Sequence, residues 1–168
     1  MFKILAYKEL STEKCLVEAS REDIQRAVLP WLDGLSEKYL RNIFGPKMPY
    51  PIDEKYILDS FGKTEKNTPF LLKENHNAVG FGSVMTQIKK NEKISWLCFI
   101  LIAPKKKGKG LGHLLVKKLI SHAKTLHPDS IKLTVYMDNI EALNLYPMHN
   151  FRFIRCLNDG KYLMKLKL

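Results

Sequence analysis

The stretch from Ile94 to Leu126 constrains the fold of this chain more than any other. The apolar run from Trp96 to Ala103 is short, rich in β-branched and aromatic residues and followed by Pro104, which favours a buried strand over a helix. Apolar residues then recur at the spacing of an amphipathic helix that begins near residues 110–112: Leu111, Leu114, Leu115, Leu119, Ala123 and Leu126. The stretch therefore predicts a buried strand that is joined to a helix by a loop.

The connecting loop, Lys105 to Gly112, contains three glycines and four lysines. Glycine lets the backbone come close to a ligand and lets N–H groups converge on it. The free N–H groups at the start of a helix, together with the helix dipole, favour an anion there. The loop therefore predicts a pyrophosphate site, and the alternative interpretation is a solvated basic loop.

The size and charge of the chain narrow the class of protein. A chain of 168 residues, 45% of them hydrophobic, suits one domain spanning residues 1–168 with a sizeable core. The net charge of +11 is compatible with a nucleic-acid, membrane or phosphorylated partner. The basic stretches lack the interleaved aromatic residues of a single-strand platform, so we do not expect nucleic acid as a partner.

Cysteine usage and hydropathy indicate a cytoplasmic protein. Cys15, Cys98 and Cys156 are isolated and lack metal-ligand spacing, and the five histidines share none either, so no metal is expected. Residues 1–10 hold too short an apolar stretch for a signal peptide, and residues 96–103 are too few to span a bilayer. We therefore expect reduced thiols and no membrane association.

Hydrophobic periodicity and turn residues predict the remaining elements. Ser20 and Asp23 have the spacing of a capping box before a helix that Pro30 should end or kink. Gly80 and Gly82 suggest a bulge or a close approach within their strand. The expected strands are 15–19, 70–74, 78–88, 94–103, 131–137, 151–157 and 161–168, and the expected helices are 24–30, 33–44, 52–61, 111–126 and 140–148.

The order of these elements predicts a mixed α/β sheet. The strand–helix–strand unit in residues 94–137 implies a parallel pair joined by a right-handed crossover. The strands before and after it are joined by short turns at 75–77, 91–93 and 158–160, which imply antiparallel pairing. We expect helices on both faces of the sheet.

Two motifs resemble those of the GNAT superfamily of acyl-CoA-dependent N-acyltransferases. Residues 104–112, PKKKGKGLG, are similar to the family's pyrophosphate loop, with Lys107 at a position where the family has Gln or Arg. Residues 139–151, NIEALNLYPMHNF, are similar to its N-x-x-A-x-x-L-Y-x-x-x-G-F run, with Asn150 in place of Gly. Asn tolerates a left-handed backbone, so the turn can be kept. The two motifs occur in the family's order on the expected elements.

The resemblance implies a fold and a cofactor. It implies a mostly antiparallel mixed sheet whose one parallel pair splays apart, so that acetyl-CoA lies beside the end of the central strand. It implies Tyr146 as the general acid for the leaving thiolate and an N–H of residues 100–102 as an oxyanion donor. The residues implied to bind acetyl-CoA are Ile100, Leu101, Ile102, Lys107, Gly108, Lys109, Gly110, Leu111, Gly112, His113, Asn139 and Tyr146.

Each of these assignments has a structural alternative. Tyr146 could be a core aromatic residue, Asn139 could cap a helix while it also contacts the cofactor, and His113 could be solvated or packed. The central strand carries no acid between residues 96 and 102, so the base is either Glu92 or a water relay.

The acceptor is expected to be a small-molecule or peptide amine, bound under residues 30–61. Asp53, Glu54 and Asp59 are candidates to make that pocket acidic, because the charge of +11 otherwise argues against a highly cationic acceptor. The aromatic residues that could line it are Trp31, Tyr39, Tyr50 and Phe61.

Direct acetyl transfer from acetyl-CoA to a primary amine is thus the leading hypothesis. One alternative is a non-catalytic acyl-CoA-binding protein of the same fold. Another is a dinucleotide-binding oxidoreductase, although His113 stands where the third glycine of G-x-G-x-x-G would be. The final hairpin is a candidate for pairing between two subunits, so a homodimer is also considered.

Overall fold

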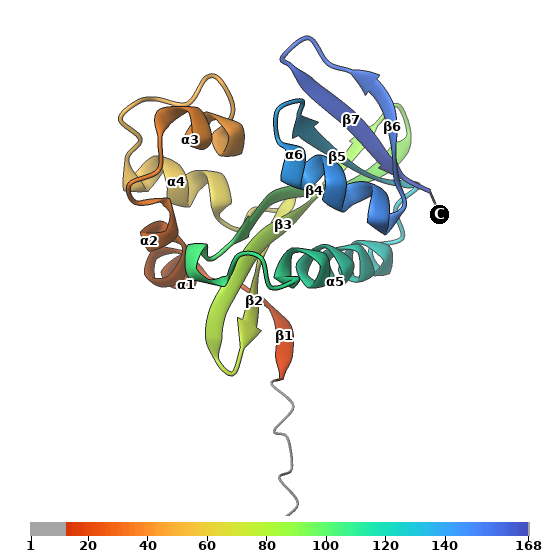
Figure 1. Ribbon diagram of the computed structural model, residues 1–168. Helices are drawn as coiled ribbons and strands as arrows, with labels where there is room; N and C mark the ends of the chain where they lie inside the picture. Colours follow the sequence, from red (N-terminus) through yellow and green to blue (C-terminus); the bar gives the residue numbers. More distant parts are fainter. Residues whose placement is uncertain (1–12, 168) are drawn as a thin grey trace, which may run out of the picture.

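A computed structural model of the chain describes residues 13–167, so the expectation about a leader in residues 1–10 lies outside the described residues. Seven strands form one sheet in the order β1-β2-β3-β4-β5-β7-β6 (Figure 1). The strands are β1 (Lys14–Glu18), β2 (Asn67–Glu74), β3 (Asn77–Lys89), β4 (Glu92–Ile102), β5 (Ser130–Tyr136), β6 (Phe151–Cys156) and β7 (Lys161–Leu166). The helices are α1 (Arg21–Asp23), α2 (Leu29–Leu32), α3 (Glu37–Phe44), α4 (Glu54–Phe61), α5 (Leu111–Thr125) and α6 (Ile140–Leu145).

The sheet confirms the predicted mixed topology. β4 and β5 are parallel, and every other neighbouring pair is antiparallel. The parallel register holds only from Ile94 opposite Ser130 to Trp96 opposite Lys132. Beyond that register β4 continues to Ile102 and β5 to Tyr136 without pairing to each other. The parallel pair is therefore splayed toward the carboxyl ends of both strands.

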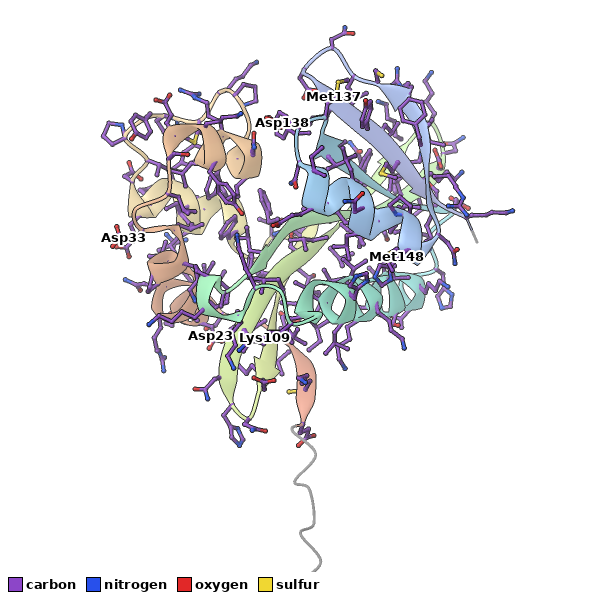
Figure 2. All side chains as sticks on the ribbon, viewed as in Figure 1. Asp23, Asp33, Lys109, Met137, Asp138 and Met148 are labelled. Carbon is purple, nitrogen blue, oxygen red and sulfur yellow. The ribbon has the colours of Figure 1, made fainter. Side chains whose placement is uncertain are left out.

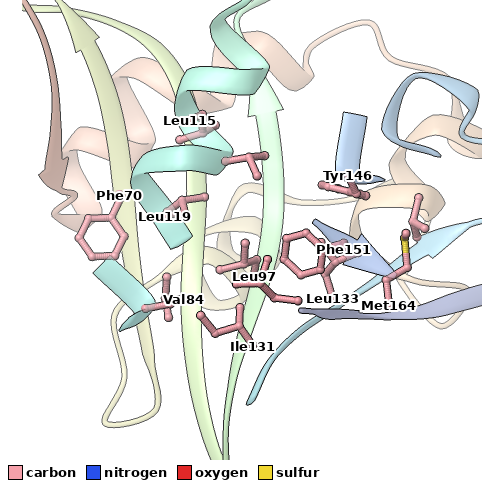
Figure 3. Packing of buried hydrophobic residues seen from close by; sticks show 14 of the residues in the cluster. Phe70, Val84, Leu97, Leu115, Leu119, Ile131, Leu133, Tyr146, Phe151 and Met164 are labelled. Carbon is pink, nitrogen blue, oxygen red and sulfur yellow. The ribbon is translucent and has the colours of Figure 1, made fainter. Parts of the chain in front are cut away.

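Helices cover both faces of the sheet and bury two apolar clusters. α5 packs on one face through Leu115 and Leu119, against Leu97 and Ile131 among others (Figure 3). α1 to α4 gather on the opposite face of β1–β4 (Figure 1). Phe61 of α4 is fully buried there, with its ring centroid 4.7 Å from that of Phe81 and 4.9 Å from that of Phe99.

Gly80 and Gly82 of β3 let α5 approach the sheet. A Cβ atom at Gly82 would lie 2.7 Å from Cδ1 of Leu119, and one at Gly80 would lie 3.3 Å from Cδ2 of Leu115. The β3–β4 register also shifts between Phe81 and Ser83. Both interpretations of the glycines, close approach and a bulge, are therefore correct.

Several predicted boundaries differ because side-chain caps fix the ends of helices. α3 begins at Glu37 rather than Asp33, since Ser36 accepts a hydrogen bond from the backbone N–H of Tyr39 and Gly34 takes φ +73°. α4 begins after Asp53, which accepts from the N–H of Tyr56 at 2.6 Å. The capping box of Ser20 and Asp23 is confirmed.

Pro30 does not end its helix. The chain forms a π-helical turn over Ile24–Val28 and then continues as α2 to Leu32, with Pro30 in the first turn of α2. Proline lacks an N–H and its ring crowds the carbonyl one turn earlier, and a widened π turn removes that conflict. The predicted helix 140–148 is likewise divided into α6 and a 3₁₀ turn, Tyr146–His149, that contains Pro147.

Candidate active site

The glycine loop forms the start of α5 as predicted. Gly108 and Gly110 have φ of +74° and +73°, and a Cβ atom at either would meet nothing within 4 Å. The first intrahelical bond of α5 runs from the N–H of Leu114 to the carbonyl of Gly110. The N–H groups of residues 111–113 therefore precede the helical ladder and remain available, which is the arrangement that binds an anion.

The lysines of the loop have different surroundings. Lys106 is paired with Glu74 at 2.7 Å, which lowers the pKa of that carboxyl group. Lys107 Nζ lies 3.3 Å from the hydroxyl of Tyr39 in α3 and 5.3 Å from the centroid of its ring. Lys105 and Lys109 are exposed, and Lys109 lies on the loop between α5 and the end of β4 (Figure 2). The loop thus offers two solvated cations and one cation held by an aromatic ring.

The end of β4 directs two backbone N–H groups into the splayed gap. The N–H of Ala103 donates to the carbonyl of Val79 in β3 at 3.0 Å. Because successive residues of a strand direct their N–H groups to opposite sides, Leu101 also faces β3, whereas Ile100 and Ile102 face away from it. Within residues 13–167, β5 offers these two residues no pairing partner.

A bulge opposite Gly82 creates this geometry, and the β4 residue that forms it was not predicted. Gly82 of β3 lies opposite both Phe99 and Ile100, because Phe81 pairs with Leu101 and Ser83 with Cys98. Phe99 has φ +53°, a conformation that an aromatic side chain rarely adopts. Nothing in a Phe within an apolar run signals a positive φ, so only the tandem glycines of β3 hinted at the irregularity.

Tyr146 is 7% exposed and lies where the 3₁₀ turn follows α6. Its ring contacts Phe151 edge-on at 5.9 Å between centroids (Figure 3). Burial raises the pKa of the phenol well above its usual range, and the neighbouring Cys98 of β4 adds to the shift. Burial likewise raises the pKa of the Cys98 thiol to about 11. A neutral phenol thus lies close to the bulged part of β4.

Asn139 and His113 have structural partners. Asn139 caps α6, since its Oδ1 accepts from the N–H of Ala142 at 3.2 Å. Nδ1 of His113 lies 3.2 Å from Nε2 of His149. Burial lowers the pKa of His149, and the charges of His113 and Lys117 lower it further, so His149 favours its neutral form.

Glu92 lies at the wrong end of the site to be the base. It begins β4, where hydrogen bonds from Ser130 (2.5 Å) and Lys132 (3.1 Å) lower its pKa. An extended strand from Glu92 to Ile100 covers about 26 Å. The carboxylate therefore lies at the paired end of β4 and β5, and the splayed end lies far from it.

The three acids of the covering segment do not line the splayed gap. Asp53 caps α4, Glu54 accepts a hydrogen bond from Gln25, and Asp59 is paired with Lys55 and Arg21. These contacts join α4 to the start of the α1–α2 segment. The four aromatic residues predicted to line the acceptor pocket do not lie together. Phe61 belongs to the core and Trp31 packs against it, whereas Tyr39 and Tyr50 are exposed.

A hollow of about 450 Å³ lies where α3 meets the end of β5. The hydroxyl of Tyr136 donates to the backbone carbonyl of Arg41 at 3.3 Å, and Lys38 is paired with Asp138 at 3.2 Å. Asp138 lies on the side of α6 that faces α3 (Figure 2). The hollow is lined by Glu37, Lys38, Arg41, Asn42, Pro46 and Tyr136. The place of Tyr136 in this hollow was not predicted, because its alternation with buried residues in the sequence indicated only a strand.

In the part of the chain that the structure describes, no group of three or more His, Cys, Asp or Glu side chains is arranged to hold a metal ion. Of the helices in residues 13–167, none combines the length and the apolar character that a membrane crossing requires.

Several solved structures share this fold. The GNAT domain of S. lividans PAT superposes with a TM-score of 0.74 at 12% identity, covering 91% of this chain and 89% of that one. A domain from Methanocaldococcus jannaschii gives 0.73 at 16% identity, covering 94% and 99%. A mutant of the spermidine N-acetyltransferase SpeG from Vibrio cholerae gives 0.69 at 19% identity, covering 91% and 92%. These likenesses establish the fold.

Sequence comparison supplies the family. No curated protein sequence matches this chain. The model of the acetyltransferase (GNAT) family matches residues 33–151, which include the glycine loop, the bulged strand and the Asn139–Tyr146 motif. Since that match spans more than half of the chain, the chain belongs to the GNAT acetyltransferase family.

Proposed function

We propose that this chain, as one domain over residues 1–168, transfers an acetyl group from acetyl-CoA directly to a primary amine. The splay between β4 and β5 carries the proposal, because it opens beside both the start of α5 and the buried Tyr146. The start of α5 suits the pyrophosphate of acetyl-CoA, and the neutral phenol of Tyr146 suits its thioester. The family membership supports acetyl transfer in general.

The backbone supports the cofactor part of the proposal. The N–H groups of residues 107–112 would hold the pyrophosphate, with Leu111 and Lys109 in the same turn. Ile100 and Ile102 would pair with the pantetheine arm through N–H groups that β3 leaves free, and Leu101 would pack beside it. One of these N–H groups would stabilise the negative charge on the carbonyl oxygen. Asn139 keeps its Nδ2 donor for the cofactor while Oδ1 caps α6.

Tyr146 would act as the general acid. The amine nitrogen attacks the carbonyl carbon, the C–S bond breaks, and the Tyr146 hydroxyl donates its proton to the leaving sulfur. Its raised pKa keeps it protonated at neutral pH. The amine loses its proton to a relay of water molecules, the alternative to Glu92 as the base. The same relay returns a proton to the Tyr146 oxygen, so that the phenol is restored for the next cycle.

The acceptor would be a small-molecule or peptide amine that enters beside α3 and Tyr136. The V. cholerae proteins of similar fold are spermidine acetyltransferases, which supports an amine acceptor. One of those structures is a dodecamer, which supports self-association, and we include a homodimer in the proposal. The proposal includes no metal.

Isothermal titration with acetyl-CoA tests the cofactor part. We expect micromolar binding of acetyl-CoA and of CoA, since both carry the pyrophosphate. NADH serves as the matched control, because it carries a pyrophosphate on a different scaffold. Absence of acetyl-CoA binding at micromolar concentrations would sink the proposal, and tighter binding of NADH would favour an oxidoreductase.

A Tyr146→Phe variant tests the chemical part. Removal of the hydroxyl should lower kcat about a hundredfold or more, as is usual for loss of a general acid. The acetyl-CoA Kd should stay within about twofold, because the ring and its contact with Phe151 remain. Thiol release with a panel of amines gives kcat, and calorimetry gives Kd. Equal turnover of both proteins would remove Tyr146 from the mechanism, and turnover of neither would favour a non-catalytic acyl-CoA-binding protein.

A further inference from the structure

The half of the sheet formed by β5, β7 and β6 has one face that the helices leave largely uncovered, with Arg152 and Arg155 exposed on it and Lys132 and Lys161 less exposed. Its other face carries Ile131, Leu133 and Met164 into the apolar cluster beneath α5. The second cluster, beneath α1–α4, contains no described residue from these three strands. Figure 1 shows α1–α4 over β1–β4 and to one side of β5–β7. Among the contacts described for residues 13–167, α3 meets this face at its edge, where the hydroxyl of Tyr136 donates to the carbonyl of Arg41.

Cations gather on this largely uncovered face. Lys132, Lys165 and Arg152 lie side by side in register across β5, β7 and β6. Neighbouring strands are about 4.8 Å apart, so these three positions form a row roughly 10 Å long. Lys161 and Arg155 lie on the same face farther along. We call the five residues Lys132, Arg152, Arg155, Lys161 and Lys165 the cationic face.

Few carboxylates oppose these charges. Glu92 is paired with Lys132 at 3.1 Å, and the charge of Lys165 contributes more weakly to the lowered pKa of the same carboxyl group. Arg152 and Arg155 are exposed, and no carboxylate among residues 13–167 lies within ion-pair distance of either. The cationic face thus keeps two arginines uncompensated at its outer strand.

The cationic face is continuous with the hollow at α3. Tyr136 lines that hollow and pairs in register with Lys161, whose Nζ lies 4.7 Å from the centroid of the Tyr136 ring and 3.1 Å from Asp159. β5 ends there, beside the splayed end of β4, because parallel strands end at the same edge of a sheet. A chain that enters the hollow with its amine can therefore extend across β7 and β6.

We propose that the cationic face binds an acidic segment of the acceptor, so that the acceptor is a peptide or protein whose reacting amine is followed by Asp or Glu residues. The inference rests on the proposed function and names its substrate class. Polyamines fit poorly, because Asp53, Glu54 and Asp59 are engaged away from the splay while the surface beside it is positive.

Matched peptides test the substrate class. Three peptides carry the same free amine, followed by four Glu, four Gln or four Lys residues. Spermidine is included as a small cationic acceptor. We expect kcat/KM by thiol release to be about five- to tenfold higher for the Glu peptide than for the Gln peptide, given the modest strength of exposed ion pairs. The advantage should shrink as salt rises from about 0.05 M to about 0.5 M.

A charge-reversal pair locates the effect. The R152E/R155E variant should lose the preference for the Glu peptide while its kcat/KM for the Gln peptide stays within about twofold. The control variant K66E/K124E changes charge equally at two exposed lysines outside the cationic face and should keep the preference. Anisotropy of labelled peptides measures binding without turnover, and circular dichroism confirms folding.

Each outcome decides the proposal. A preference for the Lys peptide or spermidine overturns it, as does a Glu preference that survives R152E/R155E. Tighter binding of a labelled oligonucleotide than of the Glu peptide overturns it in favour of nucleic acid. If the protein self-associates as its concentration rises, and the peptide no longer binds to the associated form, the proposal is overturned in favour of a second copy of the chain. A further outcome separates this proposal from the proposed function. If acetyl-CoA and the Glu peptide both bind, and R152E/R155E abolishes peptide binding, but no amine is acetylated, then the cationic face is a peptide-binding surface and the proposed transfer reaction is wrong.

Discussion

At the scale of single residues, Phe99 has the greatest influence on the shape of the site. Its positive φ places an extra residue in β4 opposite Gly82 and turns the strand before Ile100. Its ring packs against both Phe44 and Phe61, whose centroids lie 6.2 and 4.9 Å away. Aromatic packing therefore stabilises a backbone conformation that would otherwise cost about 1–2 kcal/mol.

The strain at Phe99 predicts that glycine is a more stable replacement there than alanine, which is the reverse of the usual order in a strand. Phe99→Ala and Phe99→Gly both remove the ring, but only glycine adopts φ +53° without strain. We expect Phe99→Gly to be more stable than Phe99→Ala by about 1 kcal/mol in urea unfolding. At Phe81, a buried residue without a positive φ, the glycine variant should be the less stable by roughly 0.5–1 kcal/mol. The same order at both positions would contradict the bulge.

At the scale of elements, the fit of α5 against β3 positions the anion site. The helix rests on Gly80 and Gly82, and its first turn carries the N–H groups of residues 111–113. The pair of His113 and His149 joins that turn to the turn that carries Tyr146. The two glycines of β3 thus determine how closely α5 approaches the sheet. That approach in turn determines the distance between the sheet and the N–H groups at the start of α5.

Two alanine substitutions should have opposite effects on stability. Gly82→Ala places a methyl group against Leu119 in a packed core and should lower the free energy of unfolding by about 1–3 kcal/mol. Gly112→Ala lies in the first turn of α5, where its Cβ would meet Leu145 at an ordinary 3.6 Å. It should raise stability by roughly 0.5–1 kcal/mol through helix propensity. Urea unfolding measures both, and a neutral Gly82→Ala would show that α5 can move away from the sheet.

At the scale of the whole molecule, α3 joins the two sides of the splayed gap. Tyr39 contacts Lys107 of the glycine loop. On the other side, Arg41 contacts Tyr136 at the end of β5 and Lys38 contacts Asp138 just after it. These contacts are exposed or half-buried, so each contributes little by itself. A ligand bound in the gap would add contacts to both sides and would stabilise the folded state.

Saturating acetyl-CoA should therefore raise Tm. At a hundred times Kd, linkage adds about 2.7 kcal/mol to the free energy of unfolding. For a chain of this size that corresponds to a rise in Tm of about 5–10 °C. Differential scanning fluorimetry measures the shift, with CoA as a positive control and NADH as a negative one. An equal shift with NADH would point to binding at the glycine loop alone, without use of the splayed gap.

The sequence by itself determined the local parts of this protein. The apolar run of β4, the glycines before α5, the capping box at Ser20 and the Asn139–Tyr146 motif were all predicted, because each depends on neighbours within a few residues. Backbone propensity and hydrophobic period act over that range. These parts were enough to indicate the family and the cofactor.

Only the tertiary structure decided how those parts meet. Contacts between residues distant in the chain paired Glu92 with Lys132, paired Asp59 with Arg21, and placed Phe61 in the core against Phe81 and Phe99. The bulge at Phe99, the extent of the splay and the cationic face follow from strand register, which depends on which segments pair rather than on any one segment. A one-dimensional pattern carries the period of each strand but not its partner. The sequence alone therefore indicated the candidate site for the acetyl donor, and the proposed acceptor side required the fold.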